Sequence, residues 1–230
     1  MKSMSLLQKK LKKDYYNTNN EAAFGGVERL TQQHKGKKLQ VKNWLSTQNA
    51  YSLHKPLRKK FPTRSYRTSG LNQLWQMDLM EMIPYARINK GFKYILTCID
   101  VFSRFARAQP LKTKSGTEVM ESIAKMFEGK SIPRYIQTDL GKEFYNSHVQ
   151  KLFKKHGIKH YSVNSQFKAA VVERFNRTLR EKLTRYFTYK GNKTWYIVLP
   201  SIIDTYNRSK HRGIFHIRPI DVTENYEQEL

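Results

Sequence analysis

The sequence predicts an α/β fold, in which helices pack on a mixed five-stranded sheet and a small helical domain precedes it. Three observations lead to this prediction. Three strand-like segments follow one another with short connections between residues 74 and 110. Two further strand-like segments then alternate with helical ones as far as residue 163. A long amphipathic helix and a shorter one complete the pattern, and their apolar sides need a sheet to cover.

The five predicted strands differ in pattern. The segment 94–102 is apolar on both faces and is therefore expected to be central, between neighbours at 74–80 and 104–110. Their short connections predict an antiparallel meander. The other two strands are expected at 135–138 and 158–163, after helices at 117–127 and 148–156.

The long helix is predicted over residues 168–187. At 3.6 residues per turn, one stripe of this helix is apolar; it consists of Val172, Phe175, Leu179, Leu183 and Tyr186. A second strip carries Glu173, Arg177 and Arg180, either as a solvated face with helical charge pairs or as a functional surface. A last helix is expected over 195–206, where Pro200 would introduce a kink.

Composition divides the chain into four segments. Residues 1–20 are rich in Lys and then in Asn, which is typical of a disordered basic tail. Two short amphipathic segments around Gly36 predict a helix-turn-helix-like DNA-binding domain over 21–54. Residues 55–70 carry six cations and two prolines and are expected to form an extended linker. The rest of the chain, 71–230, is expected to form the domain that contains the predicted sheet.

The charge balance points to a polyanionic partner. The chain has 43 Lys and Arg against 18 Asp and Glu, a net charge of +25, which favours nucleic acid first and an anionic membrane surface second. Residues 29–77 contain eleven cations and no acid. No apolar run is long enough to span a bilayer, so we expect a soluble, intracellular protein. The single cysteine, Cys98, excludes zinc sites that need two thiolates.

Three acids stand out by position. Asp78 lies inside an apolar strand, Asp139 follows the fourth strand, and Glu173 lies one turn into the long helix. An acid in an apolar strand is costly unless it is paired or binds a metal. If the first and fourth strands are neighbours, the three carboxylates meet and match the ligands of hard divalent cations. Two such ions support in-line phosphoryl transfer. Alternatively, Asp78 pairs with a basic neighbour and Asp139 serves only its turn.

Several cations are candidates for contact with DNA. Arg177 and Arg180 lie one and two turns beyond Glu173, where they would bind the phosphodiester. Lys142 and Lys168 either touch DNA near the metals or face water. In the basic linker the candidates are Arg58, Lys59, Lys60 and Arg64. Glu143 is a spare carboxylate near Asp139, for which a structural or solvated role is expected.

These residues resemble a known family. Three parts of the sequence resemble the DDE integrase core of retroviruses and retrotransposons. They are Asp78, the stretch QTDLGKEF at 137–144 and the stretch VERFNR at 172–177. Other segments, among them GGVERL at 25–30 and YNRS at 206–209, are more similar to the integrases of Polinton (Maverick) transposons. The resemblance implies that residues 71–230 are an integrase catalytic core with a ribonuclease-H-like fold. It also implies two Mg²⁺ or Mn²⁺ ions, no zinc, 3′-end processing and strand transfer.

The resemblance is not complete. The interval from Asp139 to Glu173 holds 33 residues, slightly shorter than in retroviruses, and the zinc domain of retroviral integrases is missing. The chain ends at Leu230 without a chromodomain or SH3-like tail, which would fit a truncated, partial or domesticated copy.

The leading hypothesis is a DNA integrase of a mobile element. It would act as a homo-multimer on element ends and target DNA, in the nucleus if the host is eukaryotic. The alternatives are a ribonuclease-H-like nuclease without joining activity and a catalytically silent DNA-binding protein.

Overall fold

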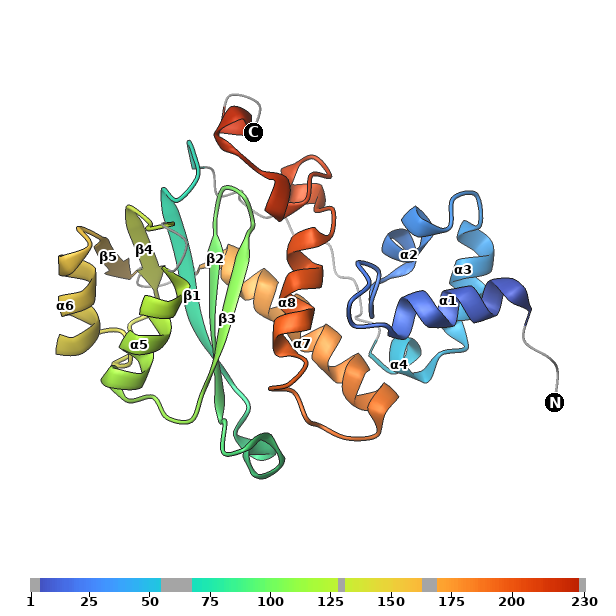
Figure 1. Cartoon of the computed structure of the whole chain (residues 1–230), viewed down its shortest axis with the longest axis horizontal. Helices are drawn as coiled ribbons and strands as arrows, with labels where there is room; N and C mark the ends of the chain where they lie inside the picture. Colours follow the sequence, from blue (N-terminus) through green and yellow to red (C-terminus); the bar gives the residue numbers. More distant parts are fainter. Residues whose placement is uncertain (1–4, 55–67, 128–130, 163–168, 228–230) are drawn as a thin grey trace. The chain divides into compact units, whose positions relative to one another are not determined.

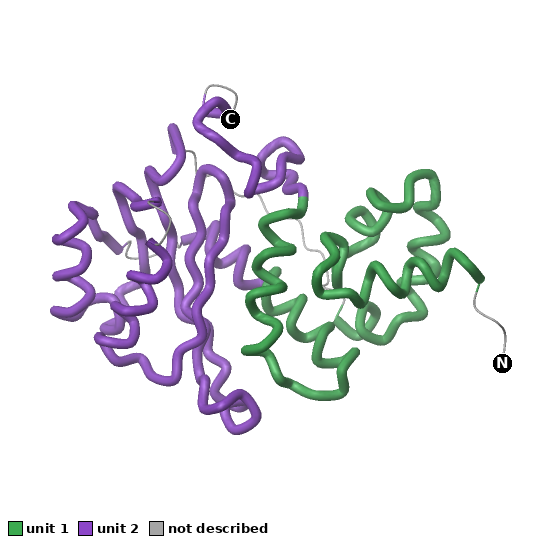
Figure 2. The backbone as a smooth tube through the Cα atoms, viewed as in Figure 1, with its two compact units in different colours: residues 1–63, 178–209 green, residues 64–177, 210–230 purple. Residues whose placement is uncertain are grey.

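A computed structural model describes residues 5–54, 68–127, 131–162 and 169–227 of the chain. The chain divides into two compact units (Figure 2). The first unit comprises residues 1–63 and 178–209, and the second comprises residues 64–177 and 210–230.

The second unit is built on a five-stranded sheet with the order β3-β2-β1-β4-β5 (Figure 1). Strands β1 to β3 pair antiparallel, whereas β4 and β5 run parallel to β1. The predicted mixed sheet and its meander are therefore confirmed. The strands are β1 (Leu74–Glu81), β2 (Tyr94–Asp100), β3 (Ala106–Leu111), β4 (Tyr135–Thr138) and β5 (Lys159–Ser162).

One face of this sheet carries the hydrophobic core. Trp75 and Met77 of β1 and Cys98 of β2 are buried there, together with apolar side chains of two helices. These helices are α5 (Gly116–Met126) and α6 (Ser147–Lys155). Burial raises the pKa of the Cys98 thiol to about 12, so this cysteine is an inert core residue at neutral pH.

The opposite face of β1 is polar at its centre. Since side chains alternate along a strand, Gln76 and Asp78 point away from the face that holds Trp75 and Met77. Gln76 is fully buried, and its amide nitrogen donates to Gln137 of β4 over 2.9 Å. Its amide oxygen accepts from the backbone N–H groups of Val171 and Val172 at 3.0 and 3.1 Å. These N–H groups belong to the first turn of α7 (Ala170–Lys190), so Gln76 anchors that turn to the sheet.

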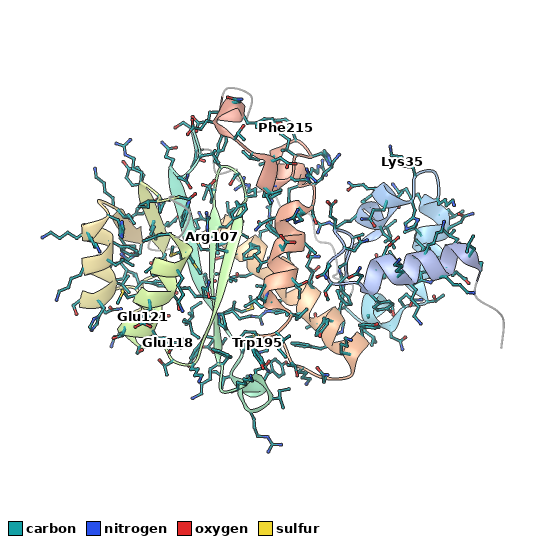
Figure 3. The ribbon with its side chains drawn as sticks, viewed as in Figure 1. Lys35, Arg107, Glu118, Glu121, Trp195 and Phe215 are labelled. Carbon is teal, nitrogen blue, oxygen red and sulfur yellow. The ribbon has the colours of Figure 1, made fainter. Side chains whose placement is uncertain are left out.

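The C-terminal segment of the second unit forms three short 3₁₀ helices, η2 (Arg212–Ile214), η3 (Pro219–Asp221) and η4 (Glu224–Glu227). They pack Ile214 and Val222 against Phe102. The neighbouring Phe215 remains 72% exposed (Figure 3). A fourth 3₁₀ helix, η1 (Ile83–Asn89), connects β1 to β2.

The first unit is helical. It contains α1 (Leu6–Tyr16), α2 (Val27–Gln33), α3 (Lys38–Ser46), α4 (Asn49–Ser52), the end of α7 from Thr178, and α8 (Leu199–Arg208). The two predicted N-terminal helices around Gly36 are confirmed as α2 and α3. The predicted disordered tail is wrong for residues 6–16, because Leu11 and Tyr15 share one face of α1 and are fully buried in the helical core.

Residues 178–209, which the sequence places in the catalytic core, are in the first unit. The reason lies in two buried cations of α7. The ammonium of Lys182 donates to the carbonyl oxygen of Ala23 over 2.7 Å, and the guanidinium of Arg185 donates to that of Phe24 over 2.5 Å. These bonds tie the second half of α7 to the loop that precedes α2.

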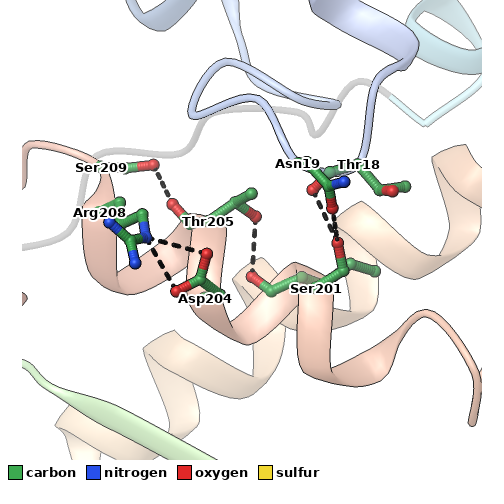
Figure 4. A network of polar contacts seen from close by, with 8 residues as sticks. Thr18, Asn19, Ser201, Asp204, Thr205, Arg208 and Ser209 are labelled. Atoms are coloured by element: carbon green, nitrogen blue, oxygen red, sulfur yellow. Dashed lines mark hydrogen bonds and ion pairs between the residues drawn. The ribbon is translucent and has the colours of Figure 1, made fainter.

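The last helix begins later than predicted. Pro200 lies in the first turn of α8, where its missing N–H costs nothing, so the proline starts the helix instead of kinking it. The hydroxyl of Ser201 lies 3.1 Å from the carbonyl oxygen of Thr18 (Figure 4). The hydroxyl of Ser209 lies 3.0 Å from the carbonyl oxygen of Glu21. In the described part of the chain, no helix has the length and apolarity that crossing a membrane requires.

Candidate carboxylate site

Asp78 and Asp139 occupy matching positions on two paired strands. The parallel ladder of β1 and β4 pairs Gln76 with Gln137, and each acid lies two residues further along its strand. Because the strands are parallel and adjacent, both carboxylates are at the same edge of the sheet. The predicted neighbourhood of the first and fourth strands is thus confirmed.

Asp78 is half-buried and held by three polar contacts. Its Oδ1 accepts from the N–H of Leu79 over 2.8 Å, and its Oδ2 accepts from the Nδ2 of Asn176 over 2.7 Å. Its carbonyl oxygen accepts from the Thr97 hydroxyl at 3.0 Å. Burial raises the pKa of Asp78, and the negative charges of Asp139 and Glu143 raise it further, whereas the two hydrogen bonds to its carboxylate lower it.

Asn176 is a residue that sequence analysis missed. It lies one turn after Glu173 on the same face of α7, and it links that helix to the carboxylate of Asp78. Its amide oxygen is buried without a hydrogen-bond partner among the residues that the structure describes. The signal in the sequence was its spacing of three residues from Glu173.

Asp139 is exposed at the end of β4. Its Oδ1 accepts from the N–H of Gly141 over 3.1 Å, so the carboxylate folds over the start of the following turn. The preceding residue is held from two sides, because the Thr138 hydroxyl lies 2.7 Å from the carbonyl oxygen of Asp139 and 2.9 Å from Nε2 of His160. Burial lowers the pKa of His160 to about 4, so this imidazole is neutral and orients the strand end without adding charge.

Gly141 lies between two carboxylates. A Cβ at this position would be 2.7 Å from Oε2 of Glu143 and 2.9 Å from Oδ1 of Asp139. Both side chains therefore approach the glycine closely, and a Cβ at this position would require the two carboxylates to shift. Glu143 also acts on the pKa of Asp78, so the structure brings a third acid to this edge.

Glu173 is exposed on the first turn of α7. That turn is anchored to β1 at Val172, through Gln76, and again at Asn176, through Asp78. Glu173 lies between these two anchors. Among the described residues, no group of three His, Cys, Asp or Glu side chains is close enough to hold a metal ion. The three predicted ligands thus share one region of the second unit without converging on one point.

The remaining predicted site residues fall into two groups. Lys142, Arg177 and Arg180 are exposed, and Arg180 belongs to the first unit. The others lie outside the described residues and stay predictions; they are Arg58, Lys59, Lys60, Arg64 and Lys168.

The predicted ligands Asp78, Asp139 and Glu173 offer carboxylate oxygens, which hard divalent cations prefer, and Glu143 adds a fourth carboxylate close to Asp139. The described side chains do not converge on one metal position. Burial, together with the negative charges of Asp139 and Glu143, raises the pKa of Asp78, so a cation bound there would favour its charged form. The orphaned amide oxygen of Asn176 is a further hard donor beside them.

Parts of this chain are similar to known proteins. Residues 69–164 match the family model of the integrase core domain. A transposon-derived protein of Caenorhabditis elegans is 41% identical over 142 residues, which cover 61% of this chain and 49% of that protein. The Gag-Pol polyprotein of feline leukemia virus is 31% identical over 133 residues, covering 56% of this chain and 8% of the polyprotein. The match therefore spans about half of the first relative and a small part of the second.

Two solved structures share the fold. A simian T-cell lymphotropic virus intasome in complex with the PP2A regulatory subunit B56 gamma matches with a TM-score of 0.56 at 22% identity, over 79% of this chain and 64% of that one. The HTLV-2 integrase catalytic core domain in complex with magnesium matches with a TM-score of 0.51 at 22% identity, over 62% of this chain and 89% of that one. The predicted integrase-core fold is thereby confirmed.

Proposed function

We propose that this protein is a DNA integrase of a mobile element, because residues 69–164 match the integrase core domain and the chain is similar to a transposon-derived protein. It processes the 3′ ends of element DNA and joins them to target DNA. The observation that carries the proposal is the placement of Asp78 and Asp139 at matching positions of β1 and β4, with Glu173 on the turn of α7 that Gln76 and Asn176 anchor.

The proposed ligands of two Mg²⁺ or Mn²⁺ ions are Asp78, Asp139 and Glu173. Support for divalent metal comes from the oxygen-only donor set and from the magnesium in the similar HTLV-2 core. When bound, such ions activate the attacking oxygen and stabilise the leaving oxygen of a phosphodiester. The side chains supply the fixed geometry: Asn176 orients Asp78, and the N–H of Gly141 orients Asp139.

The reaction has two steps of the same type. In the first, water attacks a phosphorus near the element end, the bond to the 3′ oxygen breaks, and a 3′-hydroxyl is released. In the second, this hydroxyl attacks a phosphorus of the target strand, which joins the two DNAs and releases a new 3′-hydroxyl. Neither step needs a covalent intermediate with the enzyme, so the site holds carboxylates and requires no nucleophilic side chain.

The cations would bind the DNA backbone. Arg177 is exposed one turn beyond Glu173, where it can contact the reacting phosphodiester, and Arg180 and Lys142 are exposed as well. We assign the same role to Lys168 and to the linker cations Arg58, Lys59, Lys60 and Arg64. Replacing Arg58, Lys59 and Lys60 with Gln should reduce the salt dependence of DNA binding by about 0.9 per lost phosphate contact. An unchanged slope would place the contact elsewhere.

The finer identity of the element is also a proposal. The segments GGVERL at 25–30 and YNRS at 206–209 support an integrase of the Polinton (Maverick) type. The similar integrases form an intasome and dimeric or trimeric cores, which supports a homo-multimer on DNA. Integration into host DNA would place the protein in the nucleus of a eukaryotic host.

An activity assay tests the proposal. The full chain is mixed with Mg²⁺ and a duplex that carries an element end, and joined products are separated on a denaturing gel. Replacing Asp139 with Asn should abolish joining while DNA binding persists, because the exchange removes one ligand charge and keeps the side-chain shape. Joining by Asp139→Asn at the wild-type rate would refute the proposal.

The same assay separates the rival functions. A nuclease would cut the duplex but would not join a pre-processed end that already presents a 3′-hydroxyl. A catalytically silent DNA-binding protein would bind both substrates and change neither.

A further inference from the structure

The first unit contains a shallow pocket that combines cations with aromatic rings. It has a volume of about 530 Å³ and lies far along the chain from Asp78 and Asp139. The residues that line it are Lys9, Lys12, Lys13, Tyr16, Asn17 and Tyr189.

The three lysines form one charged face. Lys12 and Lys13 follow Lys9 by three and four residues in α1, so all three side chains project from the same side of the helix. All three are exposed, and none has an ion-pair partner in the described part of the chain. The acid of this helix, Asp14, is engaged elsewhere, because its Oδ2 lies 2.9 Å from Nε2 of His34.

The aromatic part of the pocket is a rigid stack. The rings of Tyr16 and Tyr189 lie with their centroids 4.1 Å apart and their planes 24° apart. Tyr16 is held in place by its hydroxyl, which donates to the Gln48 amide oxygen over 3.1 Å, and by edge contacts with Phe24 and Trp44. Tyr189 keeps 41% of its surface exposed, and the ammonium of Lys190 lies 5.4 Å from its ring centroid.

From these features we propose that the pocket binds an unpaired segment of a DNA strand. Lysines without acid partners attract phosphates, and an exposed aromatic ring offers a surface on which a base can stack. A base within a duplex is already stacked on its neighbours, so the exposed tyrosine favours a single strand. The choice of DNA over RNA rests on the proposed function, whereas the pocket itself involves none of the carboxylates.

Fluorescence anisotropy with a labelled oligothymidylate tests the proposal. The full chain carries Asp139→Asn throughout, so that the probe stays intact. Replacing Lys9, Lys12 and Lys13 with Gln should lower the slope of log affinity against log salt by about 0.7 for each lost phosphate contact. The matched control is Lys10→Gln, because Lys10 is exposed on the same helix but does not line the pocket. Equal slopes for the triple variant and this control would overturn the proposal.

A second pair of variants tests the aromatic stack. Tyr189→Leu should weaken binding of the oligothymidylate by roughly fivefold to a hundredfold, as expected for one stacked base, whereas Tyr189→Phe should preserve it. Binding of a duplex should be the same for both variants. If Tyr189→Leu weakens duplex and single-strand binding equally, the ring does not stack on a base and the proposal is wrong. Matching melting temperatures of the Leu and Phe variants exclude a folding defect.

Failure of this proposal and failure of the integrase proposal give different results. If the pocket variants bind oligothymidylate as their controls do, the pocket proposal fails, while Mg²⁺-dependent joining by the wild-type chain can still be observed. If the wild-type chain joins no DNA, the integrase proposal fails, while the salt slopes and the comparison of Tyr189→Leu with Tyr189→Phe can still show binding at the pocket.

Discussion

The hydrogen bond between Asn176 and Asp78 makes the most specific prediction about how the site is held together. It joins the first half of α7 to β1 over 2.7 Å, and its acceptor is a half-buried carboxylate. Hydrogen bonds to charged groups are worth about 1.5–3 kcal/mol, roughly twice a neutral one. Replacing Asn176 with Ala removes the donor and leaves one carboxylate oxygen without this partner.

We therefore expect Asn176→Ala to lower the free energy of unfolding by about 1.5–3 kcal/mol at neutral pH. The hydrogen bond lowers the pKa of Asp78, so the variant should raise that pKa. The loss of stability should be largest above the pKa of Asp78, where the carboxylate is charged, and smaller in acid, where a protonated carboxyl loses only a neutral hydrogen bond.

Urea denaturation in a double-mutant cycle with Asp78→Ala isolates the pair. If the bond contributes as proposed, the coupling energy between the two substitutions is at least about 1 kcal/mol at pH 7.5 and falls at pH 4. Substitutions that add to within about 0.3–0.5 kcal/mol would refute the reasoning, because independent sites behave in this way. Arg177→Ala is the matched control, since Arg177 is the next residue of α7 but is exposed.

Two further predictions concern the strand end at Asp139. In Gly141→Ala, the new Cβ would lie 2.9 Å from Oδ1 of Asp139 and 2.6 Å from Cδ of Glu143, so both carboxylates must move. Because the ends of side chains can turn away, the melting temperature should change little, whereas joining activity should fall by up to about a hundredfold as Asp139 loses its position. The control is Gly157→Ala, because Gly157 has φ of +66° and open space where a Cβ would lie. This substitution should cost about 1 kcal/mol of stability and leave joining unchanged. Equal joining activity of the two variants would contradict this account. Burial lowers the pKa of His160 from 6.5 in the unfolded chain to about 4 in the folded protein. The unfolded chain therefore binds the proton first as the pH falls, so the stability that the neutral imidazole contributes is complete above pH 6.5 and is lost by about pH 4. Because the ring is partly exposed, we reduce this contribution to about 2 kcal/mol. Urea denaturation at pH 7.5 and 4.5 measures how much unfolding free energy is lost in acid, and this loss should be smaller by about 2 kcal/mol in His160→Gln than in the wild type. An equal loss of unfolding free energy in both proteins would refute this role of His160.

The fold could be predicted because its signals are local. Strand β2 is apolar on both faces and had to be central, and short connections required the meander. Asp78 lies within an apolar strand, and Asp139 follows a strand that runs parallel to it. Because neighbouring parallel strands end at the same side of a sheet, the two acids could be predicted to lie close together. These two acids were found by pattern alone.

What could not be predicted depends on contacts between distant segments. Residues 6–16 are polar enough to suggest disorder, and only the burial of Leu11 and Tyr15 against other helices makes them a folded element. Lys182 and Arg185 look like surface cations, yet both are buried because they find backbone carbonyl oxygens at residues 23 and 24. The spacing of Asn176 from Glu173 places it on the right face of α7, but its hydrogen bond to Asp78 depends on a side-chain direction that the sequence does not show.

Metal binding tests the central claim most directly, because the claim is that three carboxylates from β1, the end of β4 and α7 form one site. Calorimetric titration with Mn²⁺ should show binding to the wild-type chain and clear weakening in each of Asp78→Asn, Asp139→Asn and Glu173→Gln. Glu181→Gln, an exchange of a partly buried acid of the same helix, should bind as the wild type does. If Glu173→Gln binds Mn²⁺ as tightly as the wild type, Glu173 is not a ligand and the proposed site is wrong.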